Sequence, residues 1–424
     1  MNIVLLFIFL LGYTCIAFEH GIKINKAATA LLTGILCWTV YITTLAVDGG
    51  REAALEELTS HTGDIAGVLF FLLGAMTIVE LIDAHDGFEI ITRRITTTSI
   101  VKLLWIIAFI SFFVSAILDN LTCTIIMVSI LRKLIPYKNL RIKFTAIVII
   151  AANAGGAWSP IGDVPTTMLW IGGQINAASV IVKVFLPGLI SLIIPLAIFS
   201  FSIKKDFNVF IKAPQPVTEK ENIKRSVIFY SGISLFLLVP VFKTITHLPP
   251  YMGMMLALGI LWIISELIHS DKDEAEKSIL SVVTALKKID SPSVLFFLGI
   301  LLSVSALQQA GVLNSFAIWM DEYIGNTHAI VITIGLLSSI LDNVPLVAAV
   351  QGMYPLTQFP ADNNFWHFLA YCAGTGGSIL IIGSAAGVAA MGMENISFTW
   401  YLRKISIWVL LGYLAGAFLF IFLN

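Results

Sequence analysis

Charged residues are scarce in this chain of 424 residues. Only 12% are Asp, Glu, Lys or Arg, whereas 58% are hydrophobic; soluble domains carry about 25% charged residues. Several apolar runs reach the roughly 18–20 residues that cross a bilayer. The composition therefore excludes an ordinary soluble domain. It predicts an all-α polytopic membrane protein with about ten or eleven transmembrane helices.

Other signatures are missing as well. The four cysteines lie in apolar segments without the spacing of a metal site, so they are interpreted as small buried hydrophobes. No G-x-x-x-x-G-K-[ST] sequence occurs, which excludes a P-loop ATPase. With a net charge of −1 and no basic domain, no nucleic-acid partner is expected. Neither enzymatic activity nor a cofactor is predicted; the expected partners are ions and the lipid bilayer.

Apolar segments alternate with polar connections along the whole chain. Residues 3–18 lack the basic start and the small-residue cleavage site of a signal peptide, so they are interpreted as a retained first helix. Residues 48–61 are expected to be a polar connection, and residues 88–95 a short amphipathic helix at the interface. The predicted divisions are residues 1–26 as an N-terminal transmembrane helix and connection, 27–203 as a first repeat, 204–250 as a cytoplasmic loop with a linking helix, and 251–424 as a second repeat.

Two Leu-Asp-Asn sequences interrupt apolar runs at places where a charge is costly to insert. One occupies residues 118–120 and the other residues 341–343, so Asp119 and Asp342 hold equivalent positions. A carboxylate in such a place costs about 2.5–3.5 kcal/mol on insertion scales, and its repetition indicates a duplicated site. A re-entrant hairpin would place each acidic tip at mid-membrane, whereas a continuous helix is the alternative.

Glycine-rich breaks follow both of these sequences. The apolar residues 143–171 contain a Gly-Gly pair at 155–156, and residues 365–390 contain a second pair at 376–377. Glycine and proline unwind helices and free backbone carbonyls. Each repeat is therefore predicted to contain one re-entrant hairpin and one broken helix.

The distribution of basic residues predicts how these repeats cross the membrane. Cytoplasmic segments are enriched in Lys and Arg, so the basic residues 204–225 are placed inside. Counting crossings from there puts every Lys and Arg on the inside except Arg51, Lys183 and Lys243. The same count inverts the second repeat relative to the first. Two inverted-topology repeats whose broken helices meet at mid-membrane are typical of secondary transporters.

The polar side chains of these segments are oxygen donors. Carboxylate, amide and hydroxyl oxygens are the ligands that hard cations prefer, so the set predicts an alkali-cation site, most simply for Na⁺. Asn120 and Asn343 could instead cap the half-helices that follow them, and Thr124, Thr167 and Ser384 are interpreted as interhelical contacts. The candidate residues are Asp119, Asn120, Asn153, Asp163, Thr166, Ser338, Asp342, Asn343 and Ser378, with Na⁺ assigned to Asp119, Asn120, Asp342 and Asn343.

Three aspartates carry the expected mechanism. Asp119, Asp163 and Asp342 have no basic residue within a helical turn in the sequence. A buried carboxylate with no other partner takes up a proton or a cation. If the empty, charged form cannot cross the membrane, the protein must exchange one ion for the other. The pattern therefore predicts Na⁺/H⁺ antiport by alternating access.

The motifs resemble those of the NhaD-type Na⁺/H⁺ antiporters of the ion-transporter superfamily. The likeness rests on both Leu-Asp-Asn sequences, on residues 153–156 and 160–170, and on residues 376–378 and 382–387. It implies transport of Na⁺ or Li⁺ against H⁺, a homodimer with a scaffold and a moving transport domain, and a bacterial inner membrane as location. It also implies that the transport site is formed by Asp119, Asn120, Asn153, Asp163, Thr166, Asp342, Asn343 and Ser378.

Titratable residues outside these motifs have two interpretations. Glu80 and His85 stand near the end of an apolar segment that is expected to be cytoplasmic, and histidine titrates near neutral pH. They could gate protons or sense pH. They could equally be interfacial polar residues that hold the short helix after them.

Two other functions fit parts of the sequence. A sodium-coupled carboxylate or oxyanion carrier could share the architecture, but an anion site would favour cationic or neutral hairpin tips, and both tips are acidic. An intramembrane aspartyl protease could use Asp119 and Asp342. It would need neither the repeat nor Asp163.

Overall fold

The structure is a computed structural model that describes residues 2–17, 22–46, 50–92, 97, 99–202, 219–269, 280–340 and 342–424. Within these ranges every regular element is a helix. Most of the expected loop at 204–225, and Leu341 of the second Leu-Asp-Asn sequence, lie outside the described residues. Eight of the described helices are long and apolar enough to cross a membrane, and four shorter apolar helices accompany them. This confirms a polytopic all-α membrane protein.

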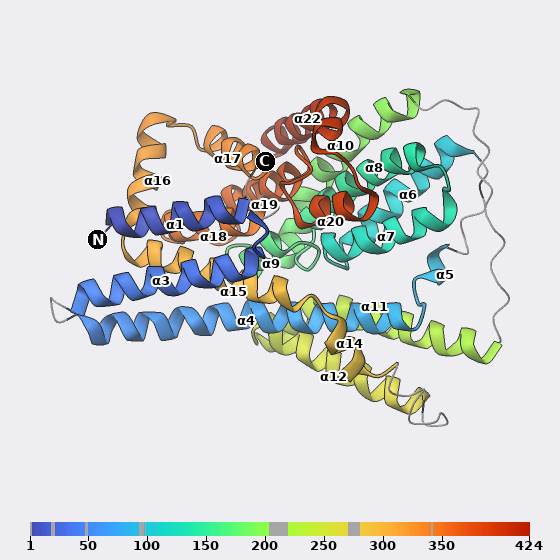
Figure 1. Ribbon diagram of the computed structural model, residues 1–424, viewed down its shortest axis with the longest axis horizontal. Coiled ribbons are helices and arrows are strands. Elements are labelled where there is room, and N and C mark those ends of the chain that lie inside the picture. The colour runs from blue at the N-terminus through green and yellow to red at the C-terminus, as the bar shows by residue number, and fades with distance from the viewer. Residues whose placement is uncertain are drawn as a thin grey trace.

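The first half of the chain combines long helices with shorter ones (Figure 1). Its helices are α1 (Asn2–Ala17), α3 (Lys26–Ala46), α4 (Arg51–Ala84), α5 (Glu89–Thr92), α6 (Ile100–Ser115), α7 (Asn120–Leu134), α8 (Lys138–Ala157), α9 (Val164–Ile171) and α10 (Ala177–Ser202).

The second half repeats this order. Its helices are α11 (Glu219–Thr246), α12 (Pro250–Ile268), α14 (Val282–Lys288), α15 (Ser291–Gln309), α16 (Val312–Tyr323), α17 (Thr327–Leu337), α18 (Asn343–Met353), α19 (Asn364–Gly376), α20 (Ala385–Glu394), α21 (Phe398–Tyr401), the π-helix η1 (Leu402–Ser406) and α22 (Ile407–Leu423).

One expectation about the first half was wrong. Most of the polar connection expected at 48–61 is helical, because α4 begins at Arg51 and runs unbroken for 34 residues; residues 48 and 49 lie outside the described residues. Its first turns are rich in Ala, Glu and Leu, which are strong helix formers, and Glu52 favours the positive end of the helix dipole. A short helix, α5 (Glu89–Thr92), lies within the segment expected to form a short helix at 88–95, of which residues 93–95 lie outside the described residues.

Both Leu-Asp-Asn sequences interrupt helices, as the hairpin interpretation requires. α6 ends at Ser115 and α7 begins at Asn120, while α17 ends at Leu337 and α18 begins at Asn343. A continuous helix through either sequence is thereby excluded. Figure 1 shows the pair α6 and α7 on one side of the molecule and α17 and α18 on the other, with α9, α19 and α20 between them.

Equivalent contacts build the two halves. α6 packs on α8 as α17 packs on α19, and α4 packs on α12 as α15 packs on α3. The Ser115 hydroxyl donates to the Ala152 carbonyl at 2.6 Å, and the Ser338 hydroxyl donates to the Ala373 carbonyl at 2.9 Å. Two pieces of chain far apart in sequence therefore form the same local structure.

Glycine is needed where the hairpins meet the broken helices. A Cβ on Gly155 would lie 2.1 Å from the Phe112 carbonyl oxygen, and one on Gly376 would lie 2.0 Å from the Gly335 carbonyl oxygen. Backbones this close admit no side chain. The Gly-Gly pairs thus bring each broken helix against its hairpin, so that the polar tips of both face a common centre.

Candidate functional site

The two tip aspartates end the breaks and begin the helices that follow. Asp119 Oδ1 accepts a hydrogen bond from the Thr122 amide at 2.9 Å, and its Oδ2 accepts from the Thr122 hydroxyl at 2.5 Å. Asp342 Oδ1 accepts from the Val344 amide at 3.3 Å. The helix caps are therefore the aspartates. The alternative in which Asn120 and Asn343 cap these helices is wrong, because both are the first residues inside them.

A buried polar cluster joins the two halves at the centre. Asn120 Nδ2 donates to Asn153 Oδ1 and to Asp163 Oδ1, at 2.9 Å each. Asn153 Nδ2 donates in turn to the hydroxyls of Ser378 at 2.8 Å and Ser384 at 2.9 Å. All five side chains are almost fully buried. One continuous network thus links the tip of the first hairpin to the broken helices of both halves.

Asp163 is held between the two hairpin tips. Its Oδ1 accepts from Asn120, and its Oδ2 accepts from Asn343 Nδ2 at 3.4 Å. Asp163 also lies close enough to Asp119 and Asp342 for electrostatic repulsion. One buried and two partly buried carboxylates within electrostatic range favour the uptake of a cation or a proton, since either relieves that repulsion.

The remaining predicted residues have more local contacts. Thr166 donates from its hydroxyl to the Ala157 carbonyl at 3.3 Å, next to the cluster. The Ser338 hydroxyl donates to the Ala373 carbonyl, a contact that joins the end of α17, the first helix of the second hairpin, to α19 rather than to the cluster. Ser384, interpreted from sequence as an interhelical contact, does contact another helix, since it accepts from Asn153 of α8, and through that bond it also belongs to the cluster. Its place just before α20, where it also caps the Gly387 amide, was the available signal.

The donor set suits an alkali cation. The cluster contains carboxylate, amide and hydroxyl groups, whose oxygens are hard ligands, although Asn120 and Asn343 direct their amide nitrogens at Asp163. Among the described residues no group of three or more His, Cys, Asp or Glu could hold a metal ion. Asp119, Asn120, Asp342 and Asn343 bring oxygen atoms to the two tips, so they are available as ligands.

Sequence reasoning missed a basic residue beside one tip. Lys26, at the start of α3, places its Nζ 3.9 Å from Asp342 Oδ2. No basic residue close in sequence accompanies Asp342, and the pairing arises because α3 reaches the tip of the second hairpin in space. Ion pairs to Asp119 are absent from the described part of the chain.

Glu80 and His85 lie apart from the cluster, near the end of α4. Glu80 Oε1 pairs with Lys288 Nζ at 3.3 Å. His85 Nδ1 lies 2.7 Å from the Leu81 carbonyl, and His85 Nε2 lies 2.8 Å from Nε2 of His269, with the rings stacked at 5.0 Å. The second histidine, at the end of α12, could not be placed from the sequence.

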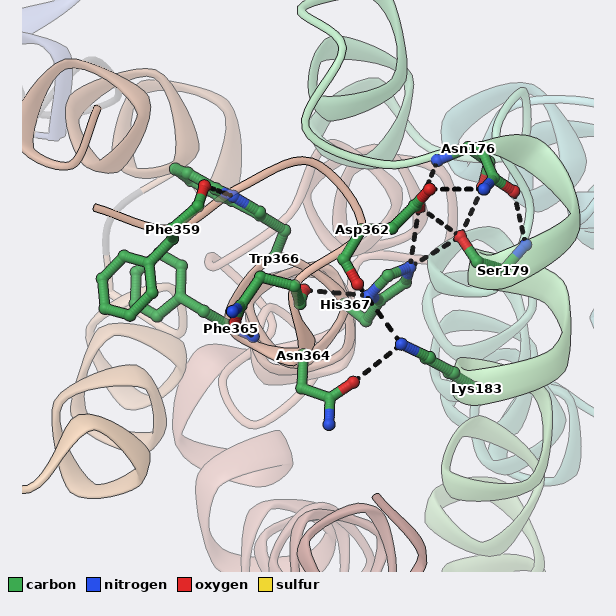
Figure 2. A network of polar contacts seen from close by, with 10 residues as sticks. Asn176, Ser179, Lys183, Phe359, Asp362, Asn364, Phe365, Trp366 and His367 are labelled. Atoms are coloured by element: carbon green, nitrogen blue, oxygen red, sulfur yellow. Dashed lines mark hydrogen bonds and ion pairs between the residues drawn. The ribbon is translucent and has the colours of Figure 1, made fainter. Parts of the chain in front are cut away.

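Polar clamps hold both ends of the broken helices. At one end Glu394, 1% exposed, receives Nε of Arg132 and of Arg141 at 2.7 Å each. At the other end Asp362 accepts from the Ser179 hydroxyl at 2.5 Å and from the Asn176 amide at 2.8 Å (Figure 2). The same network holds His367 against Ser179 and Lys183 against Asn364. These clamps tie α10 to α19, and α20 to α7 and α8.

Partial burial opposes ionisation of Asp362, but hydrogen bonds from Ser179 and Asn176 outweigh it and hold the pKa of this carboxyl below its usual value. The clamp is therefore built around an ionised aspartate at neutral pH. It lies in the connection between α18 and α19, outside the helices.

Paired hairpins, broken helices and a buried oxygen-lined centre define a polytopic membrane transport protein. A family model described as "Citrate transporter" matches residues 13–367. The chain is 46% identical to "Sodium/proton antiporter 2" of Arabidopsis thaliana, over 96% of each protein, and 48% identical to "Sodium/proton antiporter 1" of that plant, over 98% of this chain and 71% of the relative. It is 30% identical to "Na(+)/H(+) antiporter NhaD" of Vibrio cholerae, over 99% of this chain and 91% of the relative.

The chain belongs to this citrate transporter family and, within it, groups with the NhaD-type antiporters, as its motifs predicted. The family description and the relatives' names are those of transporters. That is the class that the sequence predicted.

Proposed function

We propose that this protein exchanges Na⁺ or Li⁺ for H⁺ across a membrane by alternating access at the central cluster. The observation that carries the proposal is the position of Asp163, hydrogen-bonded to an asparagine from each hairpin tip and close to both tip aspartates. The names of the similar proteins support the same exchange.

Competition for the carboxylates couples the two ions. When a cation is bound, as many carboxylates among Asp119, Asp163 and Asp342 are ionised as the cation charge balances, and they turn oxygens toward it, together with the oxygens of Asn120 and Asn343. When the cation leaves, protons replace its charge, because buried ionised carboxylates without a counter-charge are too costly to keep. Only the two neutralised forms cross readily. One ion therefore moves in exchange for the other.

The supporting residues orient this site. Asn153 accepts a hydrogen bond from Asn120 and donates to Ser378 and Ser384. It therefore fixes the tip of the first hairpin relative to the second half of the chain. Thr166 lies beside the break that carries Asp163. Ser338 acts through packing against α19.

A carboxylate or oxyanion carrier is the alternative that the family description raises. An anion would have to enter a region with three aspartates, and Lys26 beside Asp342 is the single basic partner of those residues among the described ion pairs. This favours a cation. The protease alternative is not favoured either. Asp119 and Asp342 each cap a helix, in different halves of the chain, and Asp163 lies between Asn120 and Asn343 rather than leaving the two aspartates as a pair.

His85 is the candidate pH sensor. Its Nε2 shares a short contact with His269 Nε2, and two such nitrogens can hold one proton between them but not two. Protonation of both rings would push the ends of α4 and α12 apart. Glu80, which lies five residues before His85 and pairs with Lys288 of α14, would respond to that movement and is retained as a candidate proton gate.

The wider organisation follows the sequence interpretation. The division at residues 1–26, 27–203, 204–250 and 251–424, with residues 204–225 in the cytoplasm and inverted repeats, is part of the proposal, as are a homodimer and a bacterial inner membrane. Cysteines placed at Lys212 and at Gln358 should react with an impermeant thiol reagent from opposite sides of the membrane. Reaction from one side would overturn the inversion.

The decisive experiment uses purified protein in proteoliposomes and follows Na⁺-driven proton movement with a pH dye. Asp119→Asn, Asp163→Asn and Asp342→Asn should insert, since each change lowers the cost of burial, but should not exchange ions. Thr124→Val is the matched control, because the Thr124 hydroxyl is buried with no hydrogen-bond partner among the described residues. Citrate-driven uptake in place of Na⁺ exchange would favour the carrier alternative.

A further inference from the structure

We propose that the Lys26 ammonium takes the place of a bound ion at the transport site: it pairs with Asp342 when no ion is bound and is displaced by Na⁺. We call this Lys26–Asp342 pair the latch. The proposal rests on the function proposed above and assigns a role to a residue outside the duplicated motifs. Its basis is the ammonium of Lys26, 3.9 Å from the carboxylate of Asp342, with the two side chains 26% and 18% exposed.

The two hairpin tips differ in this respect. The carboxylate of Asp119 is satisfied locally by the amide and hydroxyl of Thr122. Asp342 has no such hydroxyl, because Val344 offers only its amide. Its Oδ2 is turned toward Lys26 instead. The first residue of α12, which corresponds in the repeat to Lys26 at the start of α3, is Pro250. The cation thus serves one tip only.

Lys26 is fixed to the long-helix part of the molecule rather than to the broken helices. It begins α3, and α3 packs tightly on α15: a Cβ on Gly299 would lie 2.3 Å from the Ala30 carbonyl carbon. The Lys26 ammonium also lies over the ring of Phe296 in α15, 4.6 Å from its centroid. An aromatic face stabilises the ammonium in place. It therefore holds its position while the second hairpin approaches or leaves it.

A polar group of α1 also lies beside Asp342. The buried Tyr13 hydroxyl makes no hydrogen bond of normal geometry among the described residues, but it lies close enough to interact with both the backbone and the carboxylate of Asp342. Asp163 of the central cluster also lies close enough to Asp342 for an electrostatic interaction. A phenol, an ammonium and two carboxylates thus converge on one place, where Na⁺ and the ammonium compete for the same oxygens.

A latch of this kind would improve coupling. With the site empty, the Lys26 ammonium neutralises Asp342 and holds the second hairpin against α3, so the empty protein does not reorient. Na⁺ at Asp342 repels and displaces the ammonium, which frees the hairpin to move. A proton on Asp342 removes its charge and releases it in the same way. Both transported ions would therefore open the latch.

Removing the latch cation should tighten Na⁺ binding. Lys26→Gln should lower the half-saturating Na⁺ concentration about two- to fivefold at pH 8.5, the size expected for one partly exposed ion pair. Lys26→Arg keeps the cation and should stay near the wild type. Lys23→Gln is the matched control, because it removes the same charge from the same connection at an exposed position. At pH 6.5 the gain should shrink, since losing the ammonium also strengthens proton binding at Asp342.

A second measurement leaves Lys26 in place. Ile24→Cys introduces a thiol at a side chain that is 51% exposed, two residues from Lys26; Cys15 is replaced by Ala, and the other three cysteines are buried. Na⁺ should change the rate at which this thiol reacts with a maleimide, compared with N-methylglucamine at equal ionic strength. The additional change Lys26→Gln should abolish that Na⁺ response.

The outcomes separate the two proposals. The latch is wrong and the antiport stands if the wild type exchanges ions but Lys26→Gln does not lower the half-saturating Na⁺ concentration. The same conclusion follows if Lys23→Gln lowers that concentration as much as Lys26→Gln does. If the wild type exchanges no ions while the thiol still responds to Na⁺ through Lys26, the latch stands and the antiport is wrong. A thiol that ignores Na⁺ in a protein that exchanges ions also overturns the latch. Loss of both responses overturns both proposals.

Discussion

Asn153 offers a direct test of the cluster that joins the two halves. Its amide makes three hydrogen bonds: one from Asn120 and two to the hydroxyls of Ser378 and Ser384. Asn153→Ala removes all of them from a fully buried position. Two of the three partners retain another hydrogen bond: Asn120 still donates to Asp163, and Ser384 still accepts from the Gly387 amide. The damage should therefore fall mainly on the geometry of the site.

The magnitude follows from these partners. A buried hydrogen bond contributes about 0.5–1.5 kcal/mol net, and the partners that remain reduce the loss from three bonds to roughly two, or about 1–3 kcal/mol. If that loss acts on cation binding, the half-saturating Na⁺ concentration should rise about 5- to 150-fold. No charge is lost, so exchange at saturating Na⁺ should persist.

The assay is Na⁺-driven proton movement in proteoliposomes across a wide range of Na⁺ concentration, with thermal unfolding in detergent measured in parallel. Thr124→Val again serves as control. An Asn153→Ala protein with lower thermal stability but normal half-saturation would show that Asn153 only packs the interface, and the reasoning would be refuted. Asn153→Asp keeps the acceptor for Asn120 but adds a carboxylate near Asp163. It should require a higher pH for activity, since the added negative charge strengthens proton binding.

Three further predictions follow from the same structure. The apparent Na⁺ affinity should weaken as pH falls, near tenfold per unit for one competing proton; a flat dependence between pH 6 and 9 would mean separate sites. Glu394→Gln leaves two arginines without their buried partner and should destabilise the protein by about 2–4 kcal/mol, after allowance for the exposure of Arg132, whereas Glu266→Gln on the exposed face of α12 should not change its melting temperature. Asp362→Asn should lower the melting temperature at pH 7. Because the pKa of Asp362 is held below its usual value, its stabilisation is present above about pH 4 and is lost as pH falls through its lower, folded-state pKa, so the melting temperatures of Asp362→Asn and wild type should converge in acid.

Much of the architecture could be predicted from local chemistry. Long apolar runs predict membrane helices because the bilayer leaves the backbone no other partners. The Leu-Asp-Asn sequences and the Gly-Gly pairs mark the breaks because an aspartate caps a helix and glycine lets two backbones touch. These effects depend on a few neighbouring residues, so a single sequence reveals them. The boundary of α4 was missed because charged residues in its first turns look like a connection while remaining good helix formers.

The partners of the site residues were decided only by the tertiary structure. No local pattern connects Asn153 to Ser378 and Ser384, Lys26 to Asp342, or His85 to His269, since each pair is brought together by helices from different halves of the chain. The sequence by itself determined which polar residues the membrane interior must accommodate. Packing determined which of them neutralise one another, because electrostatic and hydrogen-bond energies depend on distances of a few ångströms that only the assembled helices set.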